Sequence, residues 1–406
     1  MTYEEEYFNS NVSEVNDMRM EILAPDLVAL AIPENKPDAT APVKLSVCIT
    51  NNTSTPFRLN PYGLFIPELV TSNGQALKRQ LATGEQLTSI PANITSNVGM
   101  WKRLANSLLS LLRNFGQSEA REIDPWSVEP EWPQVVSLTA RLSWRGNSLQ
   151  LKGSTILDVY QDPQNFNQYW LFDNLQPGNY QLRYIYNPKC GVKNHSDLNT
   201  RKQEKTLQQI GFEQLLTPLI NLRLVQPIGV ERSEVEVDGI NFKTLMPECV
   251  LTGEQKKSDA ETSVELGVCV TNNMSTPIRF SFYASFNPEM VTLDGQIVRG
   301  CYHRLGLMMA KESDFPLVMP RESITFFPEA KLFWLKRNVF TLSIAAGDGG
   351  FWNFEIPQPG VYKIRFTYSN KNAVTSVYSG GSIDKKLIEG LWTGMVSMPF
   401  VEFRLV

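Results

Sequence analysis

The chain contains the same turn sequence twice, 221 residues apart. The segment "CITNNTSTPFR" begins at Cys48 and "CVTNNMSTPIR" begins at Cys269, and the two are identical at eight of eleven positions. The same offset relates Gln75 to Gln296 further along. Motifs that recur at a fixed spacing indicate repeated structural units. The sequence therefore predicts two copies of one module.

The spacing between the two copies shortens along the chain. Trp144 corresponds to Trp334 at an offset of 190, and Trp170 corresponds to Trp352 at an offset of 182. A falling offset means that the first copy carries extra residues. The larger insertion is expected around residues 81–138, between the repeated segments.

Alternating apolar residues predict that both copies are built from strands. "VKLSVCIT" from Val43 and "VELGVCVT" from Val264 place an apolar side chain at every second position, which is the pattern of a half-buried strand. The Asn-Asn pairs that follow favour a turn. "QPGNY" and "QPGVY" precede further alternating runs and suit a type II turn. The TNNxSTP motif is interpreted first as a structural turn, with a shared ligand site as the alternative.

The order of these motifs resembles that of a known family. It runs from "TNNxSTP" through "NGQ" or "DGQ" to "PRESITFF" at Pro320 and then to "PGxYxxxxxY". This order resembles the intracellular proteinase inhibitor (BsuPI) family and similar immunoglobulin-like modules, over about residues 262–370 and less closely in the first copy. Arg321 stands where the family has Gly. The resemblance implies an immunoglobulin-like sandwich and inhibition of an intracellular proteinase.

The expected fold is mainly β, because short strands with frequent turn signals are typical of sandwiches. We expect two tandem immunoglobulin-like antiparallel β-sandwich domains, the first with a helical insertion. Residues 1–19 are expected to be a disordered acidic N-terminus, and residues 20–226 the first sandwich with its insertion around 81–138. Residues 227–240 supply the linker and the first strand of the second repeat, and residues 232–406 form the second sandwich.

Composition indicates a globular cytoplasmic protein. Of 406 residues, 42% are hydrophobic, and the formal net charge is -4, which argues against a general nucleic-acid binder. The N-terminus lacks the apolar run of a secretory signal, and no stretch approaches the roughly 18 apolar residues of a membrane helix. Five cysteines without a CxxC motif argue against a disulfide framework.

Residues that could carry catalysis are sparse. The two histidines are His195, in "CGVKNH" from Cys190, and His303, in "CYH" from Cys301. Neither motif has a second Cys/His pair at zinc-ligand spacing, so no metal or cofactor is expected. No phosphate-binding loop or nucleophile elbow occurs. "AAGDGGFW" from Ala345 is Gly-rich and is interpreted as a hairpin loop. We therefore expect no enzyme.

The insertion contains the strongest helical pattern. Residues 98–115, "VGMWKRLANSLLSLLRNF", place apolar side chains at helical spacing with a slightly basic polar face. The helix could cover its own sandwich, dock to a partner protein or lie on a membrane surface, with the last the least favoured. The candidate partner-binding residues are Trp101, Leu104, Leu108, Leu112 and Phe115.

The functional expectation is a non-enzymatic cytosolic protein that binds other proteins as a scaffold or regulator. It would act through its β-sandwich loops and the inserted amphipathic helix. The alternatives are an intracellular proteinase inhibitor and an enzyme whose site lies between the two domains. A protein partner is expected and a nucleic acid is not. The identity of the partner and the oligomeric state are left open by the sequence.

Overall fold

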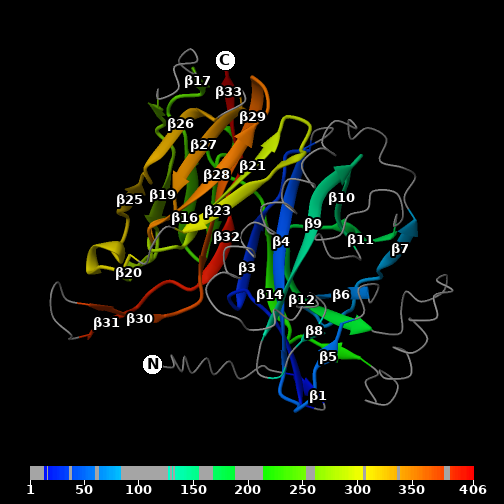
Figure 1. Ribbon diagram of the computed structural model, residues 1–406. Coiled ribbons are helices and arrows are strands. Elements are labelled where there is room, and N and C mark those ends of the chain that lie inside the picture. Colours follow the sequence, from blue (N-terminus) through cyan, green and yellow to red (C-terminus); the bar gives the residue numbers. More distant parts are fainter. Residues whose placement is uncertain are drawn as a thin grey trace, which may run out of the picture.

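The computed structural model shows a mainly β protein with several sheets (Figure 1). The described residues are 13–15, 17–35, 39–59, 64–83, 127–128, 130, 133–154, 168–187, 214–252, 261–304, 308–335, 339–378 and 385–406. Within them no α-helix occurs, only the 3-10 turns η3 (Val230–Arg232) and η4 (Glu312–Asp314). None of the helical turns in these ranges is long and apolar enough to span a bilayer. The helix expected over residues 98–115 lies outside the described residues.

The first half of the chain forms two groups of strands. One is a seven-stranded antiparallel sheet, in the order β1 (Ser13–Val15), β2 (Met18–Ile22), β4 (Thr40–Asn51), β9 (Gln134–Arg145), β10 (Ser148–Ser154), β11 (Gln168–Leu175) and β7 (Gln80–Thr83). The other contains β6 (Leu64–Thr71), β12 (Gly178–Asn187), β13 (Leu215–Leu216), β14 (Ile220–Val225) and β3 (Leu27–Ala31). A short pair, β5 (Phe57–Arg58) and β8 (Ser127–Val128), follows the TNNxSTP turn.

The second half repeats this pairing pattern. Its equivalent of the seven-stranded sheet is split into a four-stranded and a five-stranded sheet. The first has β15 (Glu234–Val237), β16 (Ile240–Leu245), β19 (Gly267–Asn272) and β25 (Ser323–Phe326). The second has β18 (Glu261–Ser263), β26 (Ala330–Leu335), β27 (Val339–Ala345), β28 (Gly350–Ile356) and β23 (Gly300–Arg304).

The remaining strands of the second half complete the correspondence. The second group here contains β21 (Phe286–Thr292), β22 (Ile297–Val298), β29 (Gly360–Asn370), β32 (Gly394–Ser397), β33 (Val401–Leu405) and β17 (Val250–Leu251). The short pair is β20 (Ile278–Arg279) with β24 (Leu317–Val318). A hairpin of β30 (Val374–Tyr378) and β31 (Lys385–Glu389) is added to this half.

Strand register locates the larger insertion. The offset of 221 still relates Thr83 at the end of β7 to Arg304 at the end of β23, but Val128 in β8 corresponds to Val318 in β24 at an offset of 190. Between these strands the first half has 43 residues, 84–126, and the second has 12, 305–316, which accounts for the difference of 31. The extra residues therefore lie between β7 and β8, inside the range expected from the sequence.

The alternation read from the sequence corresponds to buried core positions. Val43, Leu45, Val47 and Ile49 are buried in the core of the first half, and the equivalent Val264, Leu266, Val268 and Val270 are buried in that of the second. Cys48, on the opposite face of β4, is also buried. The equivalent Cys269 in β19 is half-buried.

The first Asn of each TNNxSTP motif fixes its turn in the same way. Asn51 is fully buried, and its Nδ2 donates to the backbone oxygens of Thr55 and Val128, both at 2.9 Å. Asn272 is also fully buried and donates to the equivalent oxygens of Thr276 and Val318, again at 2.9 Å. One side chain thus closes the turn and joins it to the short strand pair. The geometry gives the repeated motif a structural role in both halves.

Both Pro-Gly motifs form a corner held by a tyrosine hydroxyl. Tyr180 donates to the backbone oxygen of Gln176 at 2.9 Å, and Tyr362 donates to that of Gln358 at 2.7 Å. The expected type II turn is not found, because Gly178 has φ 149° rather than about +80° and Gly360 is not among the glycines with positive φ. Instead, each corner is held by the hydrogen bond from the tyrosine hydroxyl to the backbone oxygen four residues earlier.

The two halves share one eleven-stranded sheet. Strand β3 of the first half pairs in parallel with β14 on one side and with β32 of the second half on the other. Figure 1 shows blue β3 beside red β32 at this join. Val28 and Ala29 are fully buried there.

The N-terminal part of the chain is ordered earlier than expected, since β1 and β2 begin within residues 1–19 and Met18 is fully buried.

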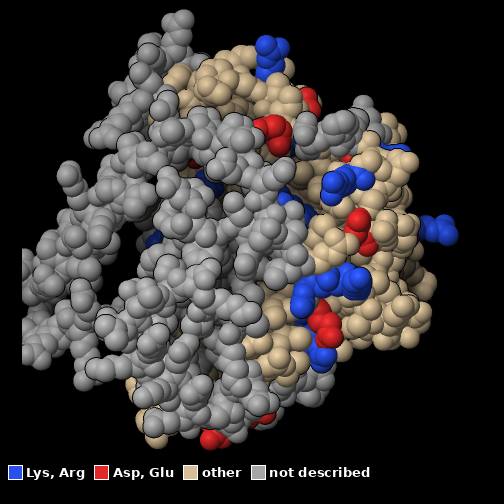
Figure 2. Space-filling model, turned by 90° about the vertical axis from the view of Figure 1, so that its right-hand side faces the viewer, with Lys and Arg blue, Asp and Glu red and all other residues tan. Residues whose placement is uncertain are grey.

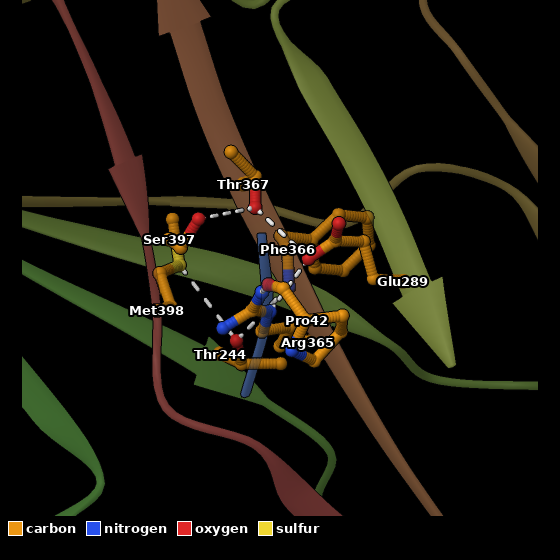
Figure 3. A network of polar contacts seen from close by, with 8 residues as sticks. All are labelled: Pro42, Thr244, Glu289, Arg365, Phe366, Thr367, Ser397 and Met398. Carbon is orange, nitrogen blue, oxygen red and sulfur yellow. Dashed lines mark hydrogen bonds and ion pairs between the residues drawn. The ribbon is translucent and has the colours of Figure 1, made fainter. Parts of the chain in front are cut away.

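A polar network lies across the same join (Figure 3). Arg365 on β29 is 1% exposed, and its Nε donates to Glu289 Oε2 at 2.6 Å. Its Nη2 donates to the backbone oxygen of Pro42, which belongs to β4 of the first half, at 2.5 Å. The guanidinium also lies 4.6 Å from the centre of the Phe400 ring. In the first half the equivalent pair of Arg183 and Glu68 is partly exposed, at 34% and 28%.

Candidate functional site

The residues proposed from the inserted helix lie outside the described residues. These are Trp101, Leu104, Leu108, Leu112 and Phe115. The motif that contains Cys190 and His195 lies outside them too. The site described below therefore comes from a different part of the chain.

Strand β23 forms an exposed edge of the second half. It is the last strand of the five-stranded sheet and pairs antiparallel with β28. Its residues Cys301, Tyr302, His303 and Arg304 are all exposed. Among the described residues no strand pairs with its outer side. A strand edge of this kind offers backbone N–H and C=O groups to another chain.

A tyrosine on this edge is held in place by a buried carboxylate. Tyr302 donates from its hydroxyl to Asp348 Oδ2 at 2.6 Å. Asp348 is buried and also accepts from the backbone N–H of Gly350 at 3.0 Å, while Arg304 Nε lies 3.7 Å from it. The carboxylate is therefore satisfied from three directions. The phenol ring of Tyr302 is fixed although it is 40% exposed.

The Gly-rich loop makes this arrangement possible. "AAGDGGFW" connects β27 to β28, as the sequence analysis predicted. Gly347 and Gly349 have φ of 84° and 85°, values that favour glycine. A Cβ on Gly350 would lie 2.6 Å from two ring carbons of Tyr302. Glycine at this position thus lets the ring lie across β28.

The environment of Tyr302 changes its titration. Burial, followed by the hydrogen bond to Asp348 and the charge of that carboxylate, raises the pKa of Tyr302 to about 12. The hydroxyl consequently remains protonated and continues to donate to Asp348 throughout the neutral pH range. The group acts here as a fixed hydrogen-bond donor.

Two exposed methionines lie beside the loop that holds the tyrosine. The backbone N–H of Met308 donates to the backbone oxygen of Asp348 at 3.3 Å, and the hydroxyl of Tyr283 donates to the backbone oxygen of Met308 at 2.5 Å. The side chains of Met308 and Met309 are exposed. We call Tyr302, Arg304, Met308, Met309 and Asp348 the edge site. In the first half, Leu81 occupies the position of Tyr302.

The parts of this site lie in separate segments of the sequence, and no local pattern links them. Strands β23 and β28 pair "CYH" with the end of "AAGDGGFW", so that Tyr302 lies opposite Trp352 and His303 opposite Phe351. The ring of His303 stacks on that of Phe351 at 5.6 Å. Within the described ranges no group of three His, Cys, Asp or Glu residues could hold a metal ion. The signal that could have located the site is a Gly-rich loop next to an aromatic edge strand.

Charged side chains are mixed on the part of the surface that Figure 2 presents. On the described portion of that face, basic and acidic residues lie beside one another and form no large patch of one sign. The formal charge of -4 is consistent with such a mixture. The expectation that nucleic acid is not a partner stays a prediction.

Comparison with known proteins identifies no family for this chain. No protein-family model and no curated protein matches the chain. Similar solved structures include Escherichia coli alpha-2-macroglobulin activated by porcine elastase, at 9% identity over 97% of this chain and 22% of that one, with a TM-score of 0.16. Salmonella alpha-2-macroglobulin reacted with methylamine is 10% identical over 96% of this chain and 16% of that one, with a TM-score of 0.18.

The chain thus spans less than a quarter of the length of these similar structures. TM-scores this low carry no argument about the site or the activity.

Proposed function

We propose that the chain is a non-enzymatic cytoplasmic protein that binds another protein, and that the edge site receives an extended segment of that partner. The observation that carries this proposal is the outer side of β23, with which no strand of the described residues pairs and beside which Tyr302 is fixed by Asp348. An extended peptide can add to such an edge through its backbone, with side-chain pockets providing specificity.

The composition of the edge site supports a protein partner. Tyrosine, methionine and arginine are enriched at the cores of protein interfaces. Tyr302 is already held in one orientation, so less side-chain entropy is lost when a partner covers it. Met308 and Met309 add adaptable apolar surface beside it.

We also infer that each half is an immunoglobulin-like, mainly antiparallel sandwich. The support is the corner formed by Tyr180 and Tyr362, because a tyrosine hydroxyl bonded to upstream backbone is a hallmark of that architecture. Inhibition of a proteinase remains a prediction that rests on the family resemblance alone.

The test is capture of partners from native extract with the full chain as bait, read by quantitative mass spectrometry. A second bait carries Tyr302→Ser with Met308→Ser, and a control carries Val230→Ser, which removes an exposed apolar residue on η3. A partner that binds at the edge site is held by the full chain and the control. Its affinity for the double variant falls about tenfold or more, which is a loss of about 1.4 kcal/mol.

A fourth bait separates the edge site from the insertion. It lacks residues 84–126 and keeps Ser127, because Val128 accepts a hydrogen bond from the buried Asn51. If a partner is lost only from this bait, the insertion rather than the edge site binds it, and the edge-site proposal is contradicted. A captured proteinase whose activity falls on binding would favour the inhibitor. Capture of nothing by the folded full chain would remove the protein-binding proposal.

A further inference from the structure

Exposed methionines gather in one stretch of the second half. In the described part of the chain, the methionines with exposed side chains are Met308, Met309 and Met319, at 53%, 57% and 44%. Others, such as Met290 and Met398, are buried in the core. Oxidation of methionine to its sulfoxide depends on access to solvent, and reductases reverse it. An oxidant in solution therefore reaches these three side chains first.

The side chain of Met308 covers the Gly-rich loop of the edge site. A Cβ built on Gly349 would lie 2.7 Å from Met308 Cγ and 3.2 Å from its Sδ, so the thioether lies directly on this glycine. The backbone N–H of Met308 also donates to the backbone oxygen of Asp348 at 3.3 Å. Glycine has no side chain with which to pack, so this part of the loop depends on Met308 for cover.

The other two exposed methionines are not bound to the loop in this way. Within the described ranges Met309 has no hydrogen bond to it, and the backbone of Met319 is bonded to Glu322 instead. The loop under Met308 carries Asp348, which accepts from the hydroxyl of Tyr302 at 2.6 Å. Any change at the sulfur of Met308 therefore acts on the loop that fixes Tyr302.

We propose that Met308 is a site of reversible oxidation by hydrogen peroxide, and that its sulfoxide releases the loop from which Asp348 holds Tyr302. A lone pair on Sδ takes one oxygen atom from the peroxide as the O–O bond breaks, and the other oxygen leaves as water. The sulfur loses two electrons and the peroxide gains them. Methionine sulfoxide reductases return the side chain to the thioether.

The sulfoxide does not fit the place of the thioether. Sδ is in contact with the loop backbone, and the added oxygen is polar and needs a hydrogen-bond donor or water. The oxidised side chain of Met308 consequently turns into the solvent that already reaches it, and the loop loses its cover. Weaker binding of a partner by the oxidised chain rests on the proposed function of the edge site, whereas release of the loop does not.

The test oxidises the purified full chain with dilute hydrogen peroxide, restores the thiols with dithiothreitol and measures each methionine by peptide mass spectrometry. NMR-detected hydrogen exchange then follows the amide of Gly350, which donates to Asp348. Oxidation of Met308 should make this amide exchange about tenfold faster or more, because its protection depends on a closed loop. The pKa of Tyr302 should fall from about 12 towards 10.0. Methionine sulfoxide reductases should restore both values.

Three variants assign the effect to one sulfur atom. Met308→Leu keeps an apolar side chain that peroxide does not oxidise, so its loop should not respond although Met309 and Met319 remain. Met319→Leu is the matched control and should respond as the unaltered chain does. Met308→Gln places a polar side chain of similar length on the loop and should speed exchange at Gly350 without peroxide.

Several outcomes would overturn the proposal. They are an equal response in Met308→Leu, no response in Met319→Leu, unchanged exchange at Gly350 in Met308→Gln or after full oxidation of Met308, and peroxide that oxidises Met309 but spares Met308. None of these measurements uses a partner. The capture experiment with the reduced chain therefore tests binding at the edge site separately, and either idea can fail without the other.

Discussion

The guanidinium of Arg365 donates to the carboxylate of Glu289 at 2.6 Å in a site where the arginine is 1% exposed. The equivalent Arg183 and Glu68 form their pair at the surface of the first half. The same Arg–Glu pair, duplicated in the sequence, thus lies in two different environments within one molecule. The difference arises because β4 of the first half covers only the second pair.

Glu289→Gln tests this difference against Glu68→Gln. Removing the carboxylate at position 289 leaves a buried arginine without its counter-charge, and the free energy of unfolding should fall by about 3 kcal/mol or more. The same change at position 68 removes a partly exposed pair and should cost about 1 kcal/mol or less. Urea denaturation of both variants checks this, and equal losses would mean that burial at the join does not distinguish the pairs.

The buried asparagines of the repeated motif should be essential for stability. Asn51→Ala or Asn272→Ala leaves two backbone oxygens without their donor, and each change should lower the free energy of unfolding by about 2 to 3 kcal/mol. Asn52→Ala and Asn273→Ala alter the exposed neighbour in each motif and should change it by about 0.5 kcal/mol or less. Thermal and urea unfolding decide between these outcomes. If the Asn51→Ala and Asn272→Ala variants were as stable as the Asn52→Ala and Asn273→Ala variants, the structural role of the buried asparagines would be contradicted.

The tyrosine corners should contribute in both halves. Tyr180→Phe and Tyr362→Phe remove only the hydroxyl and should each cost about 1 kcal/mol, the net value of a typical hydrogen bond. The hydroxyl of Tyr180 also accepts from the backbone N–H of Gln176 at 3.0 Å, so its loss should be the larger. The loss is measured as a shift in the midpoint of denaturant unfolding, with the dependence of the unfolding free energy on denaturant concentration unchanged. A variant that unfolds at the same midpoint as the unaltered chain would contradict the role of that corner.

Tyr302 should titrate well above an ordinary tyrosine. Its pKa is raised to about 12 from 10.0, so the protonated form is favoured in the folded chain. This contribution to stability is complete below about pH 10 and is lost as the pH rises through about 12. Asp348→Asn removes the negative charge and should lower the pKa of Tyr302 towards 10.

Site-resolved NMR of labelled tyrosine, assigned with Tyr302→Phe, measures that pKa. The matched control is Asp238→Asn, an exposed aspartate that pairs with Arg223 rather than with Tyr302. It should leave the titration unchanged. A Tyr302 resonance that titrates near 10 in the unaltered chain would show that Asp348 does not hold the hydroxyl.

The duplication and its strands could be read from the sequence because they depend on local patterns. The offsets between Trp170 and Trp352 and the alternation after Val43 and Val264 identify equivalent strands before any contact is known. The falling offset predicted extra residues in the first copy for the same reason. The proposed helix within it lies outside the described residues, so its role stays a prediction.

The shared sheet and the edge site could not be read in this way, because they depend on contacts between distant segments. One signal was present: "LVALA" in β3 is apolar without alternation, which is typical of a strand buried on both faces. That pattern predicts burial but does not name the partner strand. Similarly, nothing in the local sequence pairs Tyr302 with Asp348, which stand 46 positions apart.

The position of β3 has a consequence for how this chain is made. During synthesis Leu27–Ala31 leaves the ribosome long before its partner Gly394–Ser397 is translated. Until then one side of β3 and the fully buried Ala29 have no cover from the second half. The join between the two halves therefore cannot form until Gly394–Ser397 has been translated. A ribosome that stops before residue 394 therefore releases a product in which β3 has an unpaired edge, and such an edge is prone to aggregation.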